Sequence, residues 1–97
     1  MTYRIEIFLP LVEDSEAAFR NLRRDLCERF GGLTAHNRAP AEGVWRDGNG
    51  TEKDTIVIIE VMTETLDRGF WRDLRHRLES ALGQKEIVIR AQTVERL

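Results

Sequence analysis

Three side chains of this 97-residue sequence suit acid–base chemistry, namely His36, Glu60 and Glu6. A histidine beside a carboxylate is the pairing of general acid–base catalysis, because the carboxylate orients the imidazole and balances its positive charge. We name Glu60 as the first partner of His36. The same charges can instead pair across neighbouring strands and simply fix the strand register. Both interpretations remain open at the level of the sequence.

Ligand-binding candidates come from the segment 38–50, RAPAEGVWRDGNG, and from the last strand-like segment. They are Arg38, Trp45, Arg46 and Arg90. Arginine forks bind carboxylates and phosphates, and an indole N–H can fix a ligand carbonyl or carboxylate. Trp45 has three interpretations: a lid over a pocket, a plug where a hairpin leaves the body of the domain, or a residue of a subunit interface.

Known cofactor and metal motifs do not occur in this sequence. It has no glycine-rich dinucleotide or Walker pattern, no GxSxG and no HExxH. Cys27 is the single cysteine, so no disulfide forms within the chain, and no Cys/His spacing is typical of zinc. We therefore expect no metal and no cofactor, with Cys27 a small buried hydrophobe on a helix.

The charge and hydropathy of the sequence limit which classes of partner are expected. Fifteen basic and seventeen acidic residues give a net charge of −2, which offers no overall footprint for a polyanion. The arginines of both helical segments alternate with acidic residues, and we interpret them as solvated faces with helix-spaced ion pairs. There is no signal-peptide pattern and no long apolar run. These features predict a cytoplasmic protein with no nucleic-acid or membrane partner.

Hydrophobic periodicity defines the elements that must position these side chains. Alternation with period 2 predicts strands, and apolar residues at helical spacing predict helices that end at Gly31 and Gly83. For the helix starts we name Asp14 or Ser15, and Thr65 or Asp67, as N-caps. DGNG is a strong hairpin-turn signal. The expected elements are strands 3–9, 33–38, 54–62 and 85–92, helices 13–30 and 66–82, and a hairpin whose arms, 44–46 and 51–53, follow a break at RAPAEG.

The order β-α-β-β-α-β is the ferredoxin-like α+β plan. It predicts a single domain, residues 1–97, with a four-stranded antiparallel sheet of order 4-1-3-2. Both helices cover one face of that sheet, and an extended hairpin joins the second and third strands. Strand alternation then leaves one sheet face open, with these side chains on it: Arg4, Glu6, Phe8, His36, Arg38, Ile56, Ile58, Glu60, Met62, Val88 and Arg90.

This open face is too apolar for a surface that only meets water. Contiguous exposed side chains such as Ile58 and Met62 usually mark an interface. We therefore predict a homodimer, paired through sheet faces or across a sheet edge. Trp71 lies at the margin of its helical stripe and is expected in the core or a dimer contact, whereas His76 is expected in solvent.

The run FGGLTAHNRAPAEGVWRDGNG, followed by DTIVIIEVM, resembles a group of small uncharacterised bacterial proteins that share FGG, Thr, a Pro or Gly break, WRD and Gly. The resemblance covers Tyr3 to Leu97 and is most specific from Phe30 to Gly50. It implies a patterned hairpin and brings no assigned activity.

Two functional hypotheses follow. The first is a non-catalytic homodimeric module that binds a small molecule or a protein partner through the open sheet face and the Trp45 hairpin. The second is a small cofactor-independent enzyme, similar by fold analogy to dimeric ferredoxin-like monooxygenases and isomerases, that uses His36 with Glu6 or Glu60. An enzyme needs a water-accessible cavity at His36, whereas a structural dimer fills that space with apolar side chains.

Overall fold

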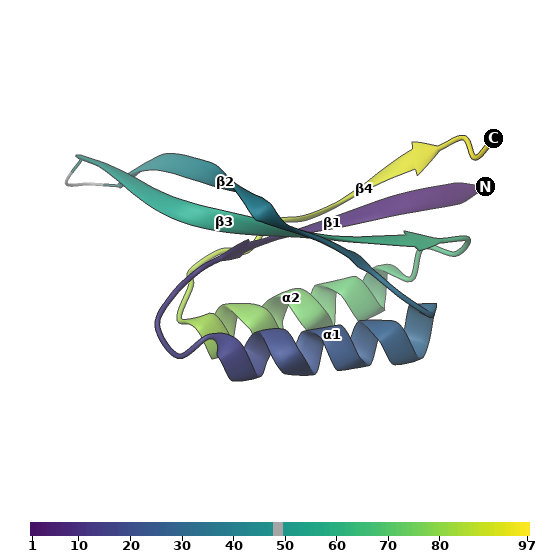
Figure 1. Cartoon of the computed structure of the whole chain (residues 1–97), viewed down its shortest axis with the longest axis horizontal. Helices are drawn as coiled ribbons and strands as arrows, with labels where there is room; N and C mark the ends of the chain where they lie inside the picture. The colour runs from purple at the N-terminus through teal and green to yellow at the C-terminus, as the bar shows by residue number, and fades with distance from the viewer. Residues whose placement is uncertain (48–49) are drawn as a thin grey trace.

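The protein has four strands and two helices in the predicted order (Figure 1). The computed structural model describes the backbone of residues 1–47 and 50–97 and the side chains of residues 1–36 and 56–97. The elements are β1 (Thr2–Pro10), α1 (Glu16–Phe30), β2 (Thr34–Asp47), β3 (Gly50–Thr63), α2 (Arg68–Leu82) and β4 (Ile89–Val94).

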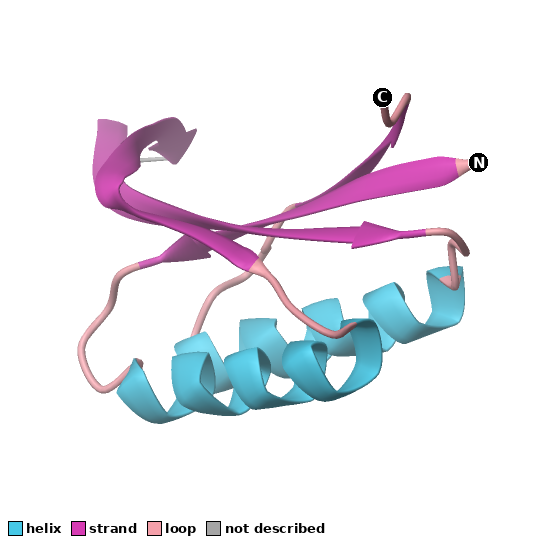
Figure 2. Ribbon diagram, turned by 45° about the vertical axis from the view of Figure 1, so that its right-hand side comes forward, coloured by secondary structure: helices cyan, strands magenta, loops and turns pink. Residues whose placement is uncertain are grey.

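The sheet is antiparallel with the order β2-β3-β1-β4, which confirms the predicted ferredoxin-like α+β fold. Figures 1 and 2 show both helices on the same side of the sheet. Side chains alternate between the two faces of a strand, so one set from each strand packs under the helices. Ile5, Ile7, Val57, Ile59 and Val61 form that buried set on the two central strands.

The β2–β3 hairpin is longer and more continuous than the sequence suggested. A break was expected at RAPAEG, but β2 runs from Thr34 to Asp47 and β3 from Gly50 to Thr63. The irregularity takes the form of a register shift, because β2 advances from His36 to Ala41 while β3 advances only from Ile58 to Ile56. A bulged strand keeps its pairing on both sides, which is how Pro40 is accommodated within it.

The fourth strand begins later than predicted. It was expected over residues 85–92, but β4 spans Ile89–Val94. The preceding segment is still held to the sheet, because Phe8 N–H donates to the Val88 carbonyl at 3.0 Å. Ile87 is fully buried in the core, so its apolar character reflects packing under the helices rather than membership of the strand.

Capping determines where the helices begin and end. Asp67 is the N-cap of α2, and its Oδ1 accepts from Phe70 N–H at 3.1 Å. Ser15, one of the two predicted N-caps, occupies the N-cap position of α1 without a side-chain cap bond. Gly31 and Gly83 adopt positive φ at the helix ends, as predicted. Cys27 is exposed, so the expectation of a buried thiol was wrong.

The hairpin extends well beyond the helices. In Figure 1 the distal parts of β2 and β3 reach past the ends of α1 and α2, which gives the molecule a long axis of 44 Å against 28 and 26 Å. Among the described residues, no helix is long and apolar enough to cross a bilayer.

Candidate functional site on the open sheet face

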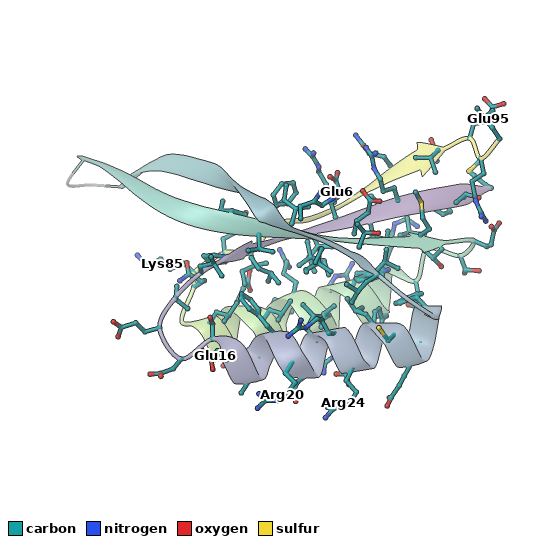
Figure 3. All side chains as sticks on the ribbon, viewed as in Figure 1. Glu6, Glu16, Arg20, Arg24, Lys85 and Glu95 are labelled. Atoms are coloured by element: carbon teal, nitrogen blue, oxygen red, sulfur yellow. The ribbon has the colours of Figure 1, made fainter. Side chains whose placement is uncertain are left out.

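The candidate residues gather on the sheet face that lies opposite the helices, here called the open face. Figure 3 shows Glu6 pointing away from the helices, whereas Arg20 and Arg24 project from the far side of α1. Alternation along β1 produces this placement, because Ile5 and Ile7 are buried beneath the sheet and the residue between them must face the other way.

The centre of the open face carries two carboxylates side by side. Glu6 of β1 and Glu60 of β3 are direct cross-strand partners. Like charges in this position repel one another and destabilise the sheet unless each has its own cation. Glu6 is the more buried of the two, with 11% of its side chain exposed, and it accepts from Arg90 Nε at 2.9 Å. Arg90 lies directly opposite it on β4.

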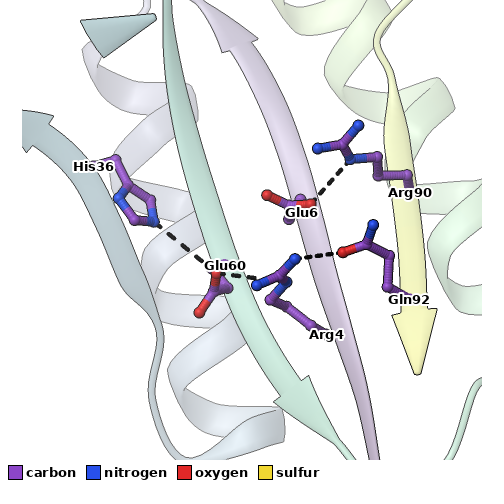
Figure 4. A network of polar contacts seen from close by, with 6 residues as sticks. All are labelled: Arg4, Glu6, His36, Glu60, Arg90 and Gln92. Carbon is purple, nitrogen blue, oxygen red and sulfur yellow. Dashed lines mark hydrogen bonds and ion pairs between the residues drawn. The ribbon is translucent and has the colours of Figure 1, made fainter. Parts of the chain in front are cut away.

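Glu60 lies beside an imidazole and a guanidinium. Its Oε1 lies 4.0 Å from His36 Nε2 and 3.9 Å from Arg4 Nε. Arg4 also donates through Nη2 to Gln92 Oε1. Figure 4 shows the resulting chain of polar contacts, which runs from His36 on β2 across β3 and β1 to Gln92 on β4. All four strands therefore contribute to one network on the open face.

His36 is placed beside Glu60, although the two are not tightly bonded. The imidazole is half exposed, and 4.0 Å is longer than a hydrogen bond. Glu60 shares its oxygen with Arg4, which reduces the carboxylate's capacity to balance a histidine cation. Two cavities lined by described residues, one beside α1 and one beside α2, do not include His36, Glu6 or Glu60. The arrangement can orient an imidazole, and it equally fixes the strand register.

Apolar side chains surround the network. Met62 and Val88 are 45% and 49% exposed, and Phe8, Ile56 and Ile58 are half-buried. The guanidinium of Arg90 lies over the Phe8 ring, 4.9 Å from its centroid, so the ion pair with Glu6 is bordered by an aromatic face. The open face thus combines internally paired charges with exposed hydrophobic surface.

Three predicted ligand-binding residues lie outside the described side chains: Arg38, Trp45 and Arg46. Gln92 was not among the predicted site residues, although it is the last residue of the expected strand 85–92 and alternates with Val88 and Arg90. Its pairing with Arg4 depends on the β1–β4 register, which places the two residues directly opposite each other. Only that register, and no local motif, could have indicated the contact.

No protein-family model and no curated protein sequence matches the chain. The chain is similar in structure to the divalent cation tolerance protein CutA1 from Thermus thermophilus, with 15% identity and a TM-score of 0.66, over 99% of this chain and 86% of that one.

Two further structures share this arrangement. One is the periplasmic divalent cation tolerance protein CutA from Archaeoglobus fulgidus, at 18% identity and a TM-score of 0.63, covering 99% of this chain and 86% of the other. The second is a phage SAM lyase in complex with S-methyl-5′-thioadenosine, at 17% identity and a TM-score of 0.62, covering 94% and 80%. At these identities the likeness shows the fold alone. The family resemblance taken from the FGG and WRD pattern stays a prediction.

Proposed function

We propose that this protein is a non-catalytic homodimeric module that uses the open face and the Trp45 hairpin to bind a second copy and a small molecule or protein partner, within the cytoplasm. The observation that carries the proposal is the open face itself. Among its described charges, Arg90 pairs with Glu6 and Arg4 lies beside Glu60 within one subunit, while Met62 and Val88 remain exposed beside them. A two-fold axis through such a face brings the same apolar side chains together without leaving a charge unpaired.

The long hairpin supports association. Ile56 still pairs with Pro10 of β1, and beyond it the described backbone of β2 and β3 pairs only within the hairpin, from Glu42–Thr55 to Asp47–Gly50. An isolated two-stranded ribbon is marginally stable in water, and packing against another layer stabilises it. Lying against a second subunit supplies that layer.

The structural neighbours are of two kinds. Two are named for divalent cation tolerance, and one is an enzyme solved with a nucleoside-containing ligand. Among the side chains that the structure describes, no group of three or more His, Cys, Asp and Glu residues could hold a metal ion. The partner that we propose for the open face is a small molecule or a protein.

Substitution of one exposed apolar residue tests the dimer. Met62→Lys places a charge in the centre of the proposed interface and should raise the dimer dissociation constant at least tenfold, since a buried unpaired charge is costly. Sedimentation equilibrium over a range of protein concentrations measures this constant.

Leu11→Lys is the matched control. Leu11 is 48% exposed, like Met62, but it follows β1 in the loop towards α1 and lies off the open face. It should leave association unchanged. A wild-type protein that stays monomeric at high concentration would contradict the proposal, as would equal weakening by both substitutions.

A second candidate function rests on the exposure of His36 beside Glu60. A cofactor-independent enzyme would use this imidazole as a general base, with Glu60 or Glu6 as its carboxylate partner. The enzyme in the neighbouring structure shows that the fold hosts catalysis, although fold alone assigns no chemistry. His36→Gln separates the two functions, because it should abolish turnover of any substrate found and leave the dimer dissociation constant within twofold.

A further inference from the structure

A second surface of the molecule lies at the opposite side of the sheet, between α2 and the edge strand β4. A cavity of about 410 Å³ opens there, within the range of small-molecule sites. Four arginines line it: Arg68, Arg72 and Arg75 from α2, and Arg90 from β4. We call this cavity the α2 groove. The three α2 arginines give it a local positive charge in a protein whose net charge is −2, while Arg90 is already paired with Glu6.

The three helix arginines have no carboxylate partner among the described residues. They follow one another at positions i, i+4 and i+7, so they lie on one face of α2 and repel each other. Arg75 has Glu79 four residues on, but Glu79 is engaged elsewhere. Its Oε1 lies 3.5 Å from His76 Nδ1, and its Oε2 accepts from Ile87 N–H at 2.9 Å.

The wall of the groove is apolar and aromatic. Trp71 and Ile89 line it together with the arginines. Trp71 is only 6% exposed, and its indole stacks on Phe30 with centroids 5.2 Å apart. Its Nε1 is buried without a hydrogen-bond partner among the described residues. The groove therefore combines a rigid apolar wall with unpaired guanidinium groups.

We propose that the α2 groove binds an organic diphosphate, with the phosphates on the α2 arginines and a flat apolar group against the Trp71 wall. Guanidinium forks match phosphate oxygens in bidentate geometry, and unpaired arginines gain most from an added anion. Arg68 and Arg75 are seven residues apart, about 10 Å along the helix axis. Two linked phosphates offer more oxygens along this row than one phosphate does, so a diphosphate can engage more of its guanidinium groups at once.

This site is separate from the open face. The three α2 arginines lie on the helical side of the sheet, and only Arg90 belongs to both regions. Arg90 keeps its Nε on Glu6, so we assign ligand contact to the α2 arginines first. The proposal therefore stands or falls independently of the dimer.

Calorimetric titration tests the proposal with four probes. Adenosine 5′-diphosphate should bind more tightly than inorganic pyrophosphate, and adenosine without phosphate should not bind measurably. Citrate carries three negative charges without phosphate and should bind at least tenfold more weakly than the diphosphate. If the protein binds citrate as tightly as the diphosphate, the ligand class is not a phosphate. If pyrophosphate and the nucleotide bind with equal affinity, the Trp71 wall does not contact the ligand.

Paired variants locate the site. Arg72→Gln should weaken binding of adenosine 5′-diphosphate about tenfold, the loss expected for a charge-assisted hydrogen bond. Arg77→Gln changes an exposed arginine of the same helix that does not line the groove, and should alter affinity less than twofold. In a Trp45→Phe background Trp71 is the only tryptophan, and its fluorescence should change on binding. Equal effects of the two arginine variants, or an unchanged Trp71 signal, would overturn the proposal.

Discussion

Arginines behave differently in the two regions of this molecule. On the open face, Arg90 and Arg4 each lie beside a carboxylate of a central strand. In the α2 groove, Arg68, Arg72 and Arg75 have no such partner among the described side chains. The difference shows that an arginine contributes to folding where the neighbouring element supplies a desolvated carboxylate, and is available for a ligand where it does not.

Burial explains why the open-face pairs are structural. Glu6 is nearly buried, whereas more than half of the Arg90 side chain is exposed. The carboxylate is therefore the group that loses hydration on folding, and the arginine compensates for this loss. In the groove the arginines themselves remain exposed or half-exposed, so deleting one leaves no buried charge behind.

The largest expected effect is on folding stability and compares an arginine of the open face with one of the α2 groove. Arg90→Ala should lower the free energy of unfolding by about 2 kcal/mol, because Glu6 is left with an unpaired, desolvated carboxylate. This value is below that of a fully buried pair, since Arg90 is partly solvated. Arg72→Ala should change stability by less than about 0.5 kcal/mol. Urea denaturation measures both, at a protein concentration well below the dimer dissociation constant, so that association does not contribute.

A compensating substitution sharpens that result. Glu6→Gln added to Arg90→Ala removes the buried charge and should recover part of the lost stability. If Arg72→Ala proved as destabilising as Arg90→Ala, the groove arginines would be structural and the contrast between the regions would fail.

Lowering the pH should have a smaller effect on folding stability, confined to the start of α2, the helix that lines the groove. The N–H of Phe70, and next the guanidinium of Arg29, hold the pKa of Asp67 below its usual value of 3.8. A lowered pKa in the folded protein means that the ionised carboxyl stabilises the fold above pH 3.8, and that this contribution is lost as pH falls through the folded pKa. Asp67→Asn keeps a capping side chain without the charge. The wild type should be more stable than Asp67→Asn at neutral pH, and this advantage should shrink below pH 3.8.

Urea denaturation at about pH 7 and at steps from about pH 4 to about pH 2.5 measures that difference. Asp67→Ser is a second uncharged cap and should behave as Asp67→Asn does. An advantage that persists unchanged at the lowest pH would show that the substitution disturbs the cap geometry rather than removing a charge.

The fold could be predicted because local patterns and global packing agree. Alternation in β1 and β3, the two helical stripes, and Gly31 and Gly83 at the helix ends all specify their elements locally. Element boundaries failed where tertiary contacts decide. Ile87 has strand-like neighbours but belongs to the hydrophobic core before β4 begins, and β2 continues past the irregularity between His36 and Ala41 because its pairing with β3 resumes at Ala41–Ile56.

Contacts within the candidate sites could be predicted from the sequence less completely than the fold. The alternation of β1 and β3 placed Glu6 and Glu60 on the open face, but the contact of Arg4 with Gln92 requires the β1–β4 register. The helix arginines were interpreted as members of helix-spaced ion pairs. Among the described helix residues only His76 and Glu79 make one, while Arg29 bridges to Asp67 of another element. Composition shows which charges are present, and only the packing shows which carboxylates are already engaged.

The smallest expected effect has opposite signs at two arginines of the same helix. Arg72 has Arg68 four residues before it and Arg75 three residues after it, so Arg72→Gln relieves repulsion and should raise the free energy of unfolding by about 0.3 kcal/mol. Arg77 has Asp73 four residues before it, and although the two are not in ion-pair contact, Arg77→Gln removes a longer-range attraction and should lower stability by up to a similar amount. Thermal midpoints in low salt measure both, and about 0.5 M NaCl should reduce both changes by screening. If both variants were destabilised equally, the α2 arginines would have partners, and the groove would lose the unpaired charge on which ligand binding depends.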